Sequence, residues 1–222
     1  MNFSLSRRAV AEFFGTAFLV TAIIGSGVMA ERLSGGNIAL ALLANTMATG
    51  AALVALILTF RPISGAHLNP IVSLTEGFVR AITWKEAGIY VAAQIAGGVA
   101  GAACADAMFA LPTFSLSRHA RTGAPQWFSE CIATFGLILV IRSCARFERA
   151  LLPFAVACYI VAAYWFTSST SFANPAVTIA RSLSDTFAGI RPADVPEFIA
   201  AQLVGGFSAV FVFDWLSPQS NE

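Results

Sequence analysis

Two Asn-Pro steps contain the most informative side chains of this sequence. Segment 67–71 reads His-Leu-Asn-Pro-Ile, and segment 172–176 reads Phe-Ala-Asn-Pro-Ala. Asn is a preferred N-cap residue and Pro a preferred first helical residue, so each step predicts a helix that begins with a carboxamide at its positive end. Two such ends aimed at one point would repel cations and donate hydrogen bonds to a neutral solute. The residues concerned are Asn69, Pro70, Ile71, Asn174, Pro175 and Ala176.

The composition excludes an ordinary soluble domain. Of the 222 residues, 57% are hydrophobic and 11% charged, and the mean hydropathy is +0.75. Soluble domains average about 45–50% apolar and about 25% charged residues. The formal net charge of +1 provides no basic field for nucleic acid. The four cysteines, Cys104, Cys131, Cys144 and Cys158, lack metal-ligand spacing and are predicted to be buried thiols, so we expect neither a metal nor a cofactor.

Six apolar segments are candidates for membrane-spanning helices, each of which needs about 20 mainly apolar residues. They are 9–29, 38–60, 89–109, 128–141, 151–167 and 195–215. The first follows Arg7 and Arg8 but exceeds the roughly 7–15-residue core of a signal peptide, so we expect it to be retained. The fourth ends at Arg142, whose side chain we expect to reach the membrane interface.

The chain contains an internal repeat. A cut near Arg121 gives two halves with the same order of two spans, an Asn-Pro segment too short to span (62–80 or 168–191), and a third span. The halves also open alike, with Ala-Glu-Phe-Phe-Gly-Thr at 11–16 and Ser-Glu-Cys-Ile-Ala-Thr at 129–134. Because each half has three spans, the second must enter from the opposite side, which makes the repeat inverted. We therefore expect an all-α membrane protein, with six transmembrane helices and two re-entrant half-helices in one channel domain 1–222, and repeats at 7–110 and 125–217.

The basic residues favour one orientation. With the amino terminus in the cytoplasm, eight of the 13 basic residues lie inside and five outside. The inner set is Arg7, Arg8, Arg61, Arg80, Lys85, Arg142, Arg146 and Arg149, and the outer set is Arg32, Arg118, Arg121, Arg181 and Arg191. The positive-inside rule then places both termini in the cytoplasm of a cell that carries the protein in its inner or plasma membrane.

The loops that precede the two predicted half-helices should line water. Non-helical backbone survives at membrane depth only where it is buried in protein or faces a water-filled space. We expect the pore-lining carbonyls to be those of Gly65, Ala66, His67, Thr170, Phe172 and Ala173. Carboxylates within spans are costly without partners, so Glu12 and Glu130 should each accept bonds from loop amides of their own half. A proton relay through these residues and a gating role for His67 are less favoured alternatives to structural support.

On these residues the chain resembles the major intrinsic protein family, the aquaporins and aquaglyceroporins. The resemblance extends from 11–16 through Ser-Gly-Ala-His-Leu-Asn-Pro at 64–70 and Asn-Pro-Ala at 174–176 to the sixth span. It implies six spans and two half-helices per subunit, and a homotetramer with four independent pores. It also implies that the partners are the lipid bilayer, water and small neutral solutes.

The resemblance further implies a constriction formed by four positions. Offsets from the two Asn-Pro steps place them at Thr49, Ala162, Ser171 and Val177, with Tyr164 as the rival for the second position. Water-selective members usually have an aromatic residue, a His and an Arg there, and glycerol facilitators have two aromatics and the Arg. Aromatic rings narrow a pore and a guanidinium adds donors and charge, so we expect this ring to be wide and uncharged.

Arg181 follows Val177 by one helical turn, about 6 Å further toward the outer mouth. It is either a partial substitute for the missing arginine or, as we favour from sequence alone, a vestibule charge or a partner of Asp185.

We interpret the chain as a passive channel for small uncharged solutes, of the aquaglyceroporin type, and not as an enzyme. Family members with open constrictions conduct glycerol, urea and undissociated metalloid acids such as arsenious acid, and the resemblance implies this class of solutes here. A water-selective aquaporin is the first alternative. A secondary transporter is less favoured because coupling needs ion sites, and Glu12 and Glu130 are the acidic residues well within the predicted spans. A non-conducting junctional membrane protein is the remaining alternative.

Overall fold

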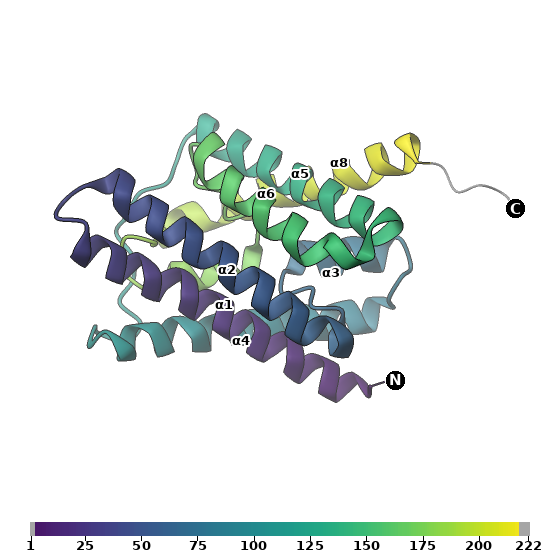
Figure 1. Ribbon diagram of the computed structural model, residues 1–222, viewed down its shortest axis with the longest axis horizontal. Helices are drawn as coiled ribbons and strands as arrows, with labels where there is room; N and C mark the ends of the chain where they lie inside the picture. The colour runs from purple at the N-terminus through teal and green to yellow at the C-terminus, as the bar shows by residue number, and fades with distance from the viewer. Residues whose placement is uncertain (1–2, 218–222) are drawn as a thin grey trace, which may run out of the picture.

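The computed structural model describes residues 3–217, and every regular element in that range is helical (Figure 1). The long helices are α1 (Leu5–Leu33), α2 (Ile38–Ser64), α4 (Trp84–Met108), α5 (Ala124–Phe147), α6 (Leu152–Phe166) and α8 (Val195–Leu216). Two short helices follow the Asn-Pro steps, α3 (Pro70–Phe78) and α7 (Pro175–Arg181). Single 3-10 turns, η1 (Arg149–Leu151) and η2 (Pro192–Asp194), precede α6 and α8. The predicted fold class is confirmed.

The six spans predicted from hydropathy are all present, but most of the helices are longer. Within the described range, six helices are long and apolar enough to cross a membrane. The additional turns are polar: α2 continues through Arg61 and Pro62, and α5 continues through Arg142. Hydropathy ends a span where charge begins, whereas the helix continues because its backbone still needs hydrogen-bond partners.

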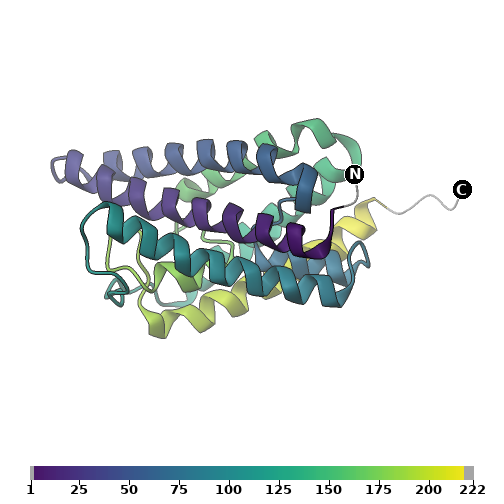
Figure 2. The ribbon, with the colours of Figure 1, turned by 90° about the horizontal axis from the view of Figure 1, so that it is seen from below.

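The two halves of the chain pack in the same way. Helix α1 contacts α2 and α4, just as α5 contacts α6 and α8. The short helix α3 lies against α4 and α8, and α7 lies against α8 and α4. Helix α1 begins and α8 ends at the same end of the bundle, which we call the proximal end, and the opposite end is the distal end (Figures 1 and 2). Helix α2 ends at the proximal end and α6 ends at the distal end (Figure 1), so the half-helices that follow them enter from opposite ends.

Glycine allows the first and last helices of each half to touch. A Cβ built on Gly97 or Gly101 of α4 would lie 2.2 or 2.3 Å from a carbonyl oxygen of α1. A Cβ built on Gly205 of α8 would lie 2.1 Å from the carbonyl oxygen of Cys131 in α5. Small residues at such crossings let the backbones approach closely, which is how helices associate in lipid.

The prediction of buried cysteines is wrong. Cys104 and Cys158 are exposed on the helix surface, and Cys131 and Cys144 are partly exposed. Large apolar side chains such as Phe18 and Phe211 are exposed on the same helices. A span presents apolar side chains outward as well as inward, so an apolar neighbourhood does not predict burial inside the protein.

Replacing Gly101 by Val should destabilise the α1–α4 crossing, because the new side chain has no room beside the Ala17 carbonyl. Overpacking of this kind costs about 1–3 kcal/mol. Thermal unfolding of the purified protein in detergent measures the loss. Gly88→Val in the same helix is the control, since a Cβ at Gly88 meets nothing within 4 Å; equal losses in the two variants would contradict the account.

Candidate functional site

The two Asn residues join the half-helices end to end. The Asn69 side-chain oxygen accepts a bond from the Ile71 amide at 2.9 Å, and that of Asn174 accepts one from the Ala176 amide at 3.0 Å, so both residues are N-caps. Each carboxamide also donates across the junction, Asn69 to the Ala173 carbonyl at 2.7 Å and Asn174 to the Leu68 carbonyl at 2.8 Å. One N–H of each amide is thus used in the clamp and one remains for the cavity.

The loops before the caps share an unusual backbone conformation. Gly65, Ala66 and Leu68 have φ values of 94°, 51° and 49°. The residues at the same three offsets from Asn174, namely Thr170, Ser171 and Ala173, have φ values of 62°, 49° and 46°. Left-handed conformations at non-glycine residues cost on the order of 1–3 kcal/mol each and persist only where neighbours fix them.

Glu12 fixes the first loop. Its carboxylate accepts bonds from the amides of His67 (3.0 Å) and Leu68 (2.6 Å), from the Ser64 hydroxyl (2.6 Å) and from the Gln94 side chain (2.8 Å). Glu12 is completely buried, and these four donors replace the water that its carboxylate would bind if it were exposed. A buried carboxylate with several donors is stable without a cation.

Glu130 fixes the second loop with the same set of donors. It accepts bonds from the amides of Phe172 (2.8 Å) and Ala173 (2.9 Å), from Ser169 (2.6 Å) and from Gln202 (2.6 Å). Each carboxylate thus accepts bonds from two amides of the loop in its own half. Among the described residues, no hydrogen bond joins Glu12 or Glu130 to an imidazole ring or to a second carboxylate.

His67 lies in the cavity wall with its ring anchored. Its Nδ1 is 3.0 Å from the Ser73 hydroxyl oxygen, and its ring lies edge-on to Tyr90 with centroids 5.1 Å apart. This is the geometry of a loop anchor.

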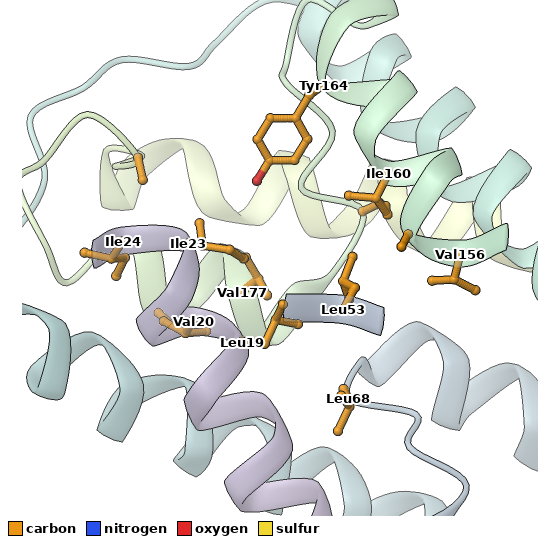
Figure 3. Close-up of a cluster of buried hydrophobic side chains, with 14 of the residues drawn as sticks. Leu19, Val20, Ile23, Ile24, Leu53, Leu68, Val156, Ile160, Tyr164 and Val177 are labelled. Carbon is orange, nitrogen blue, oxygen red and sulfur yellow. The ribbon is translucent and has the colours of Figure 1, made fainter. Parts of the chain in front are cut away.

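A cavity of about 370 Å³ passes between these loops and four long helices. The loop side is polar and includes Asn69 and Asn174. The opposite side is aliphatic and is formed by Leu19, Ile23, Leu53, Ile57, Leu137, Ile141, Val156 and Ile160. Figure 3 shows several of these side chains grouped around one space, with the Tyr164 hydroxyl pointing into it. One polar and one apolar wall suit a small solute that exchanges hydrogen bonds on one side only.

Comparisons with known proteins agree with this architecture. The family described as "Major intrinsic protein" matches residues 1–167. Aquaglyceroporin AqpS of Rhizobium meliloti strain 1021 is 51% identical over 97% of this chain and 92% of its own length, and Aquaporin AqpM of Methanothermobacter marburgensis is 29% identical over 97% of this chain and 99% of its own. The crystal structure of the aquaglyceroporin from Plasmodium falciparum superimposes with a TM-score of 0.74, at 21% identity, covering 95% of this chain and 96% of that one.

The chain belongs to the major intrinsic protein family. It is therefore a multi-pass membrane channel for small solutes and not an enzyme.

Within this family member, the structure corrects one of the four constriction positions. Thr49, Ser171 and Val177 lie in the cavity wall, but Ala162 is exposed on the outside of α6. Tyr164 is 3% exposed, lines the cavity and donates a hydrogen bond to the Thr49 hydroxyl at 3.4 Å. Two residues along a helix rotate a side chain by about 200°, so Ala162 and Tyr164 cannot share a face. The cavity wall at the predicted constriction thus includes an aromatic side chain, contrary to the expectation from sequence.

A second correction concerns the carbonyls of the loops. Thr170 lies outside the cavity wall, where its hydroxyl is 3.4 Å from the Arg121 guanidinium, whereas Gly65, Ala66, His67, Phe172 and Ala173 do line the cavity. Sequence analysis missed Leu68, whose carbonyl accepts the Asn174 bond. The equivalence of Leu68 and Ala173, each directly before an Asn, could have revealed it.

Arg121 also escaped sequence analysis. Its buried guanidinium donates to the carbonyls of Gly189 (2.8 Å) and Ser169 (3.1 Å) and so supports the distal loop. No sequence signal marks it, since its acceptors are main-chain atoms far along the chain.

Two motif residues lie behind the pore. Ile71 is completely buried in a cluster with Ile138, Ala209 and Val210, and Ala176 is completely buried against Gly98 of α4. Neither residue lines the cavity, so the Ile of the first motif does not narrow the lumen.

Arg181 does not pair with Asp185, which was one of the alternatives predicted from the sequence. Asp185 accepts bonds from the Arg118 amide (2.9 Å) and guanidinium (2.8 Å), and these bonds lower the pKa of Asp185. Arg181 is instead buried in the cavity wall and donates to the Ala188 carbonyl.

Replacing Glu12 by Gln should loosen the proximal loop. The substituted amide presents an NH2 group to donors that need an acceptor, and each unsatisfied buried group costs about 1–3 kcal/mol. We expect a lower unfolding temperature in detergent and reduced solute flux. Glu31→Gln, at an exposed position of the same helix, is the control and should change neither.

The corrected ring predicts opposite results at two neighbouring positions. Tyr164→Ala should increase the flux of solutes larger than water, because it removes the aromatic side chain from the cavity wall. Ala162→Leu should leave flux unchanged, because that side chain faces outward. Stopped-flow reswelling of proteoliposomes measures both, and the reverse pattern would restore the original assignment.

Proposed function

We propose that this channel conducts uncharged solutes larger than water, with glycerol, urea and undissociated metalloid acids such as arsenious acid as the solute class. The observation that carries the proposal is Val177, which takes the constriction position that the resemblance assigns to an arginine. An aliphatic side chain there provides no fixed donor and no charge. A 51% identical relative is named an aquaglyceroporin, which supports the same class.

The polar groups of the ring suit such solutes. The Ser171 hydroxyl is buried and has no protein partner among the described residues. It lies in the same wall as the Thr49 and Tyr164 hydroxyls, and Val177 completes the ring. A polyol or a neutral metalloid acid carries several hydroxyl groups. The hydroxyls of the ring can replace the water molecules that hydrate these groups.

One observation favours the runner-up, a water-selective channel. Tyr164 contacts Thr49 and reduces the opening between α6 and α2. The size of the gap that Val177 leaves therefore decides between the two functions.

We further propose a homotetramer in a cell membrane with both termini in the cytoplasm. The start of α1 and the end of α8 at one end of the bundle, together with the excess of basic residues on that side, support this orientation. In these terms the proximal end is cytoplasmic and the distal end is outer.

Stopped-flow light scattering of proteoliposomes tests the solute class. The wild-type protein should give fast reswelling with glycerol, urea and an undissociated metalloid acid at matched osmotic steps. Val177→Arg should lower solute flux by about tenfold or more while water flow continues, because an arginine narrows the ring and adds fixed donors. Val177→Met, which adds bulk without charge, separates the effect of size from that of the guanidinium.

Two outcomes would contradict this proposal. Fast water flow without reswelling in the wild type would establish the water channel instead. Unchanged solute flux in Val177→Arg would place the constriction elsewhere.

A further inference from the structure

Arg181 is the largest side chain that is completely buried in the described part of the chain. It ends the seven-residue helix α7, yet no described carboxylate forms an ion pair with it. Its Nε–H donates to the Ala188 carbonyl, which uses one of five guanidinium donors. A buried guanidinium without a counterion is stable at membrane depth where its remaining donors have hydrogen-bond acceptors, either in the protein or in water.

The guanidinium is held in a fixed position. Its central carbon lies 3.4 Å from the centre of the Phe172 ring, and Phe172 in turn lies edge-on to Phe198 with centroids 5.3 Å apart. Stacking on an aromatic face suits the planar guanidinium and is unavailable to a hydrated point charge such as Lys. The Ala188 carbonyl and the Phe172 ring together hold the guanidinium in place.

This fixed charge borders the cavity. Arg181 lines it together with Tyr164, Ser171 and Val177, so the terminal N–H groups that lack protein acceptors are left for water or solute. Arg121, the other buried arginine nearby, is not in the cavity wall and directs its donors at loop carbonyls. Among the described residues, Arg181 is thus the basic side chain of the distal part of the cavity.

We propose that Arg181, which follows Val177 by one helical turn, excludes cations from this pore. The ring of Thr49, Tyr164, Ser171 and Val177 selects by size and hydrogen bonding, and the guanidinium of Arg181 supplies the charge barrier. The half-helix ends at Asn69 and Asn174 contribute only about half a charge each, whereas Arg181 contributes a full one. The inference concerns the pore of the proposed function, but it does not depend on which neutral solute passes.

Cation flux in proteoliposomes tests the assignment. Sodium entry and proton entry are followed with trapped fluorescent indicators, and glycerol reswelling is measured on the same vesicles. Arg181→Gln should raise sodium and proton permeability by about tenfold or more, because one full charge is removed from a poorly solvated wall. Neutral flux should persist or increase. Arg118→Gln is the matched control, since it removes the same charge from an exposed distal residue outside the cavity wall, and it should remain closed to cations.

Two further variants keep the result decisive. If Arg181→Gln does not fold, Arg181→Met preserves apolar packing on Phe172 without charge and should leak cations. The double variant Val177→Arg with Arg181→Gln returns a guanidinium to the wall one turn inward and should restore exclusion.

Separate outcomes address the two proposals. A folded Arg181→Gln channel that conducts neutral solutes and stays closed to sodium and protons would overturn the assignment. The barrier would then belong to the half-helix ends or to Arg61 and Arg149, which line the proximal end of the cavity and are partly solvated. A cation leak in Arg181→Gln with no neutral flux in the wild type would support the role of Arg181 while refuting the proposed function.

Discussion

Everything in this channel depends on two stretches of non-helical backbone that remain ordered at membrane depth. Lipid cannot satisfy free amides and carbonyls, so the loops exist only because Glu12 and Glu130 accept their inward amides. With the amides bound on one side, the left-handed residues between them turn carbonyls toward the other side. The polar wall of the cavity is therefore a consequence of two buried carboxylates behind it.

Both halves have a supporting carboxylate, but they differ in which side chain donates a hydrogen bond to the first carbonyl of the loop. The Ser64 carbonyl accepts a bond from the Tyr90 hydroxyl at 2.8 Å, whereas the equivalent Ser169 carbonyl accepts one from Arg121 at 3.1 Å. Tyr90 is bound in turn by Arg8, which pairs with Glu86 at the proximal end. The inverted repeat thus fixes which carbonyls need a donor, and each side of the membrane supplies a different one.

The sequence predicted the features that depend on composition and periodic order. Six spans, two re-entrant segments and the two supporting carboxylates follow from hydropathy and from the repeat, because lipid imposes those constraints on any chain. Features that depend on the rotation of a helix about its axis were not accessible. Ala162 and Tyr164 differ by two residues, and only the packing of α6 against α2 decides which one faces the cavity. The exposed cysteines have the same origin, since apolar neighbours specify neither the lipid side nor the pore side of a helical residue.

Arg181 shows why a missing residue is not equivalent to a missing function. At Val177 a guanidinium would occupy the cross-section through which solute passes, so charge and size would be set at one level. Arg181 follows one turn further along α7, and its guanidinium is stacked on Phe172 and held by the Ala188 carbonyl in the cavity wall. Coulomb repulsion acts over several ångströms in a poorly solvated space, whereas steric selection acts only at contact. A charge held against the cavity wall by its own partners can thus keep its electrostatic effect while it gives up its steric one, and this separation allows a ring to widen without admitting ions.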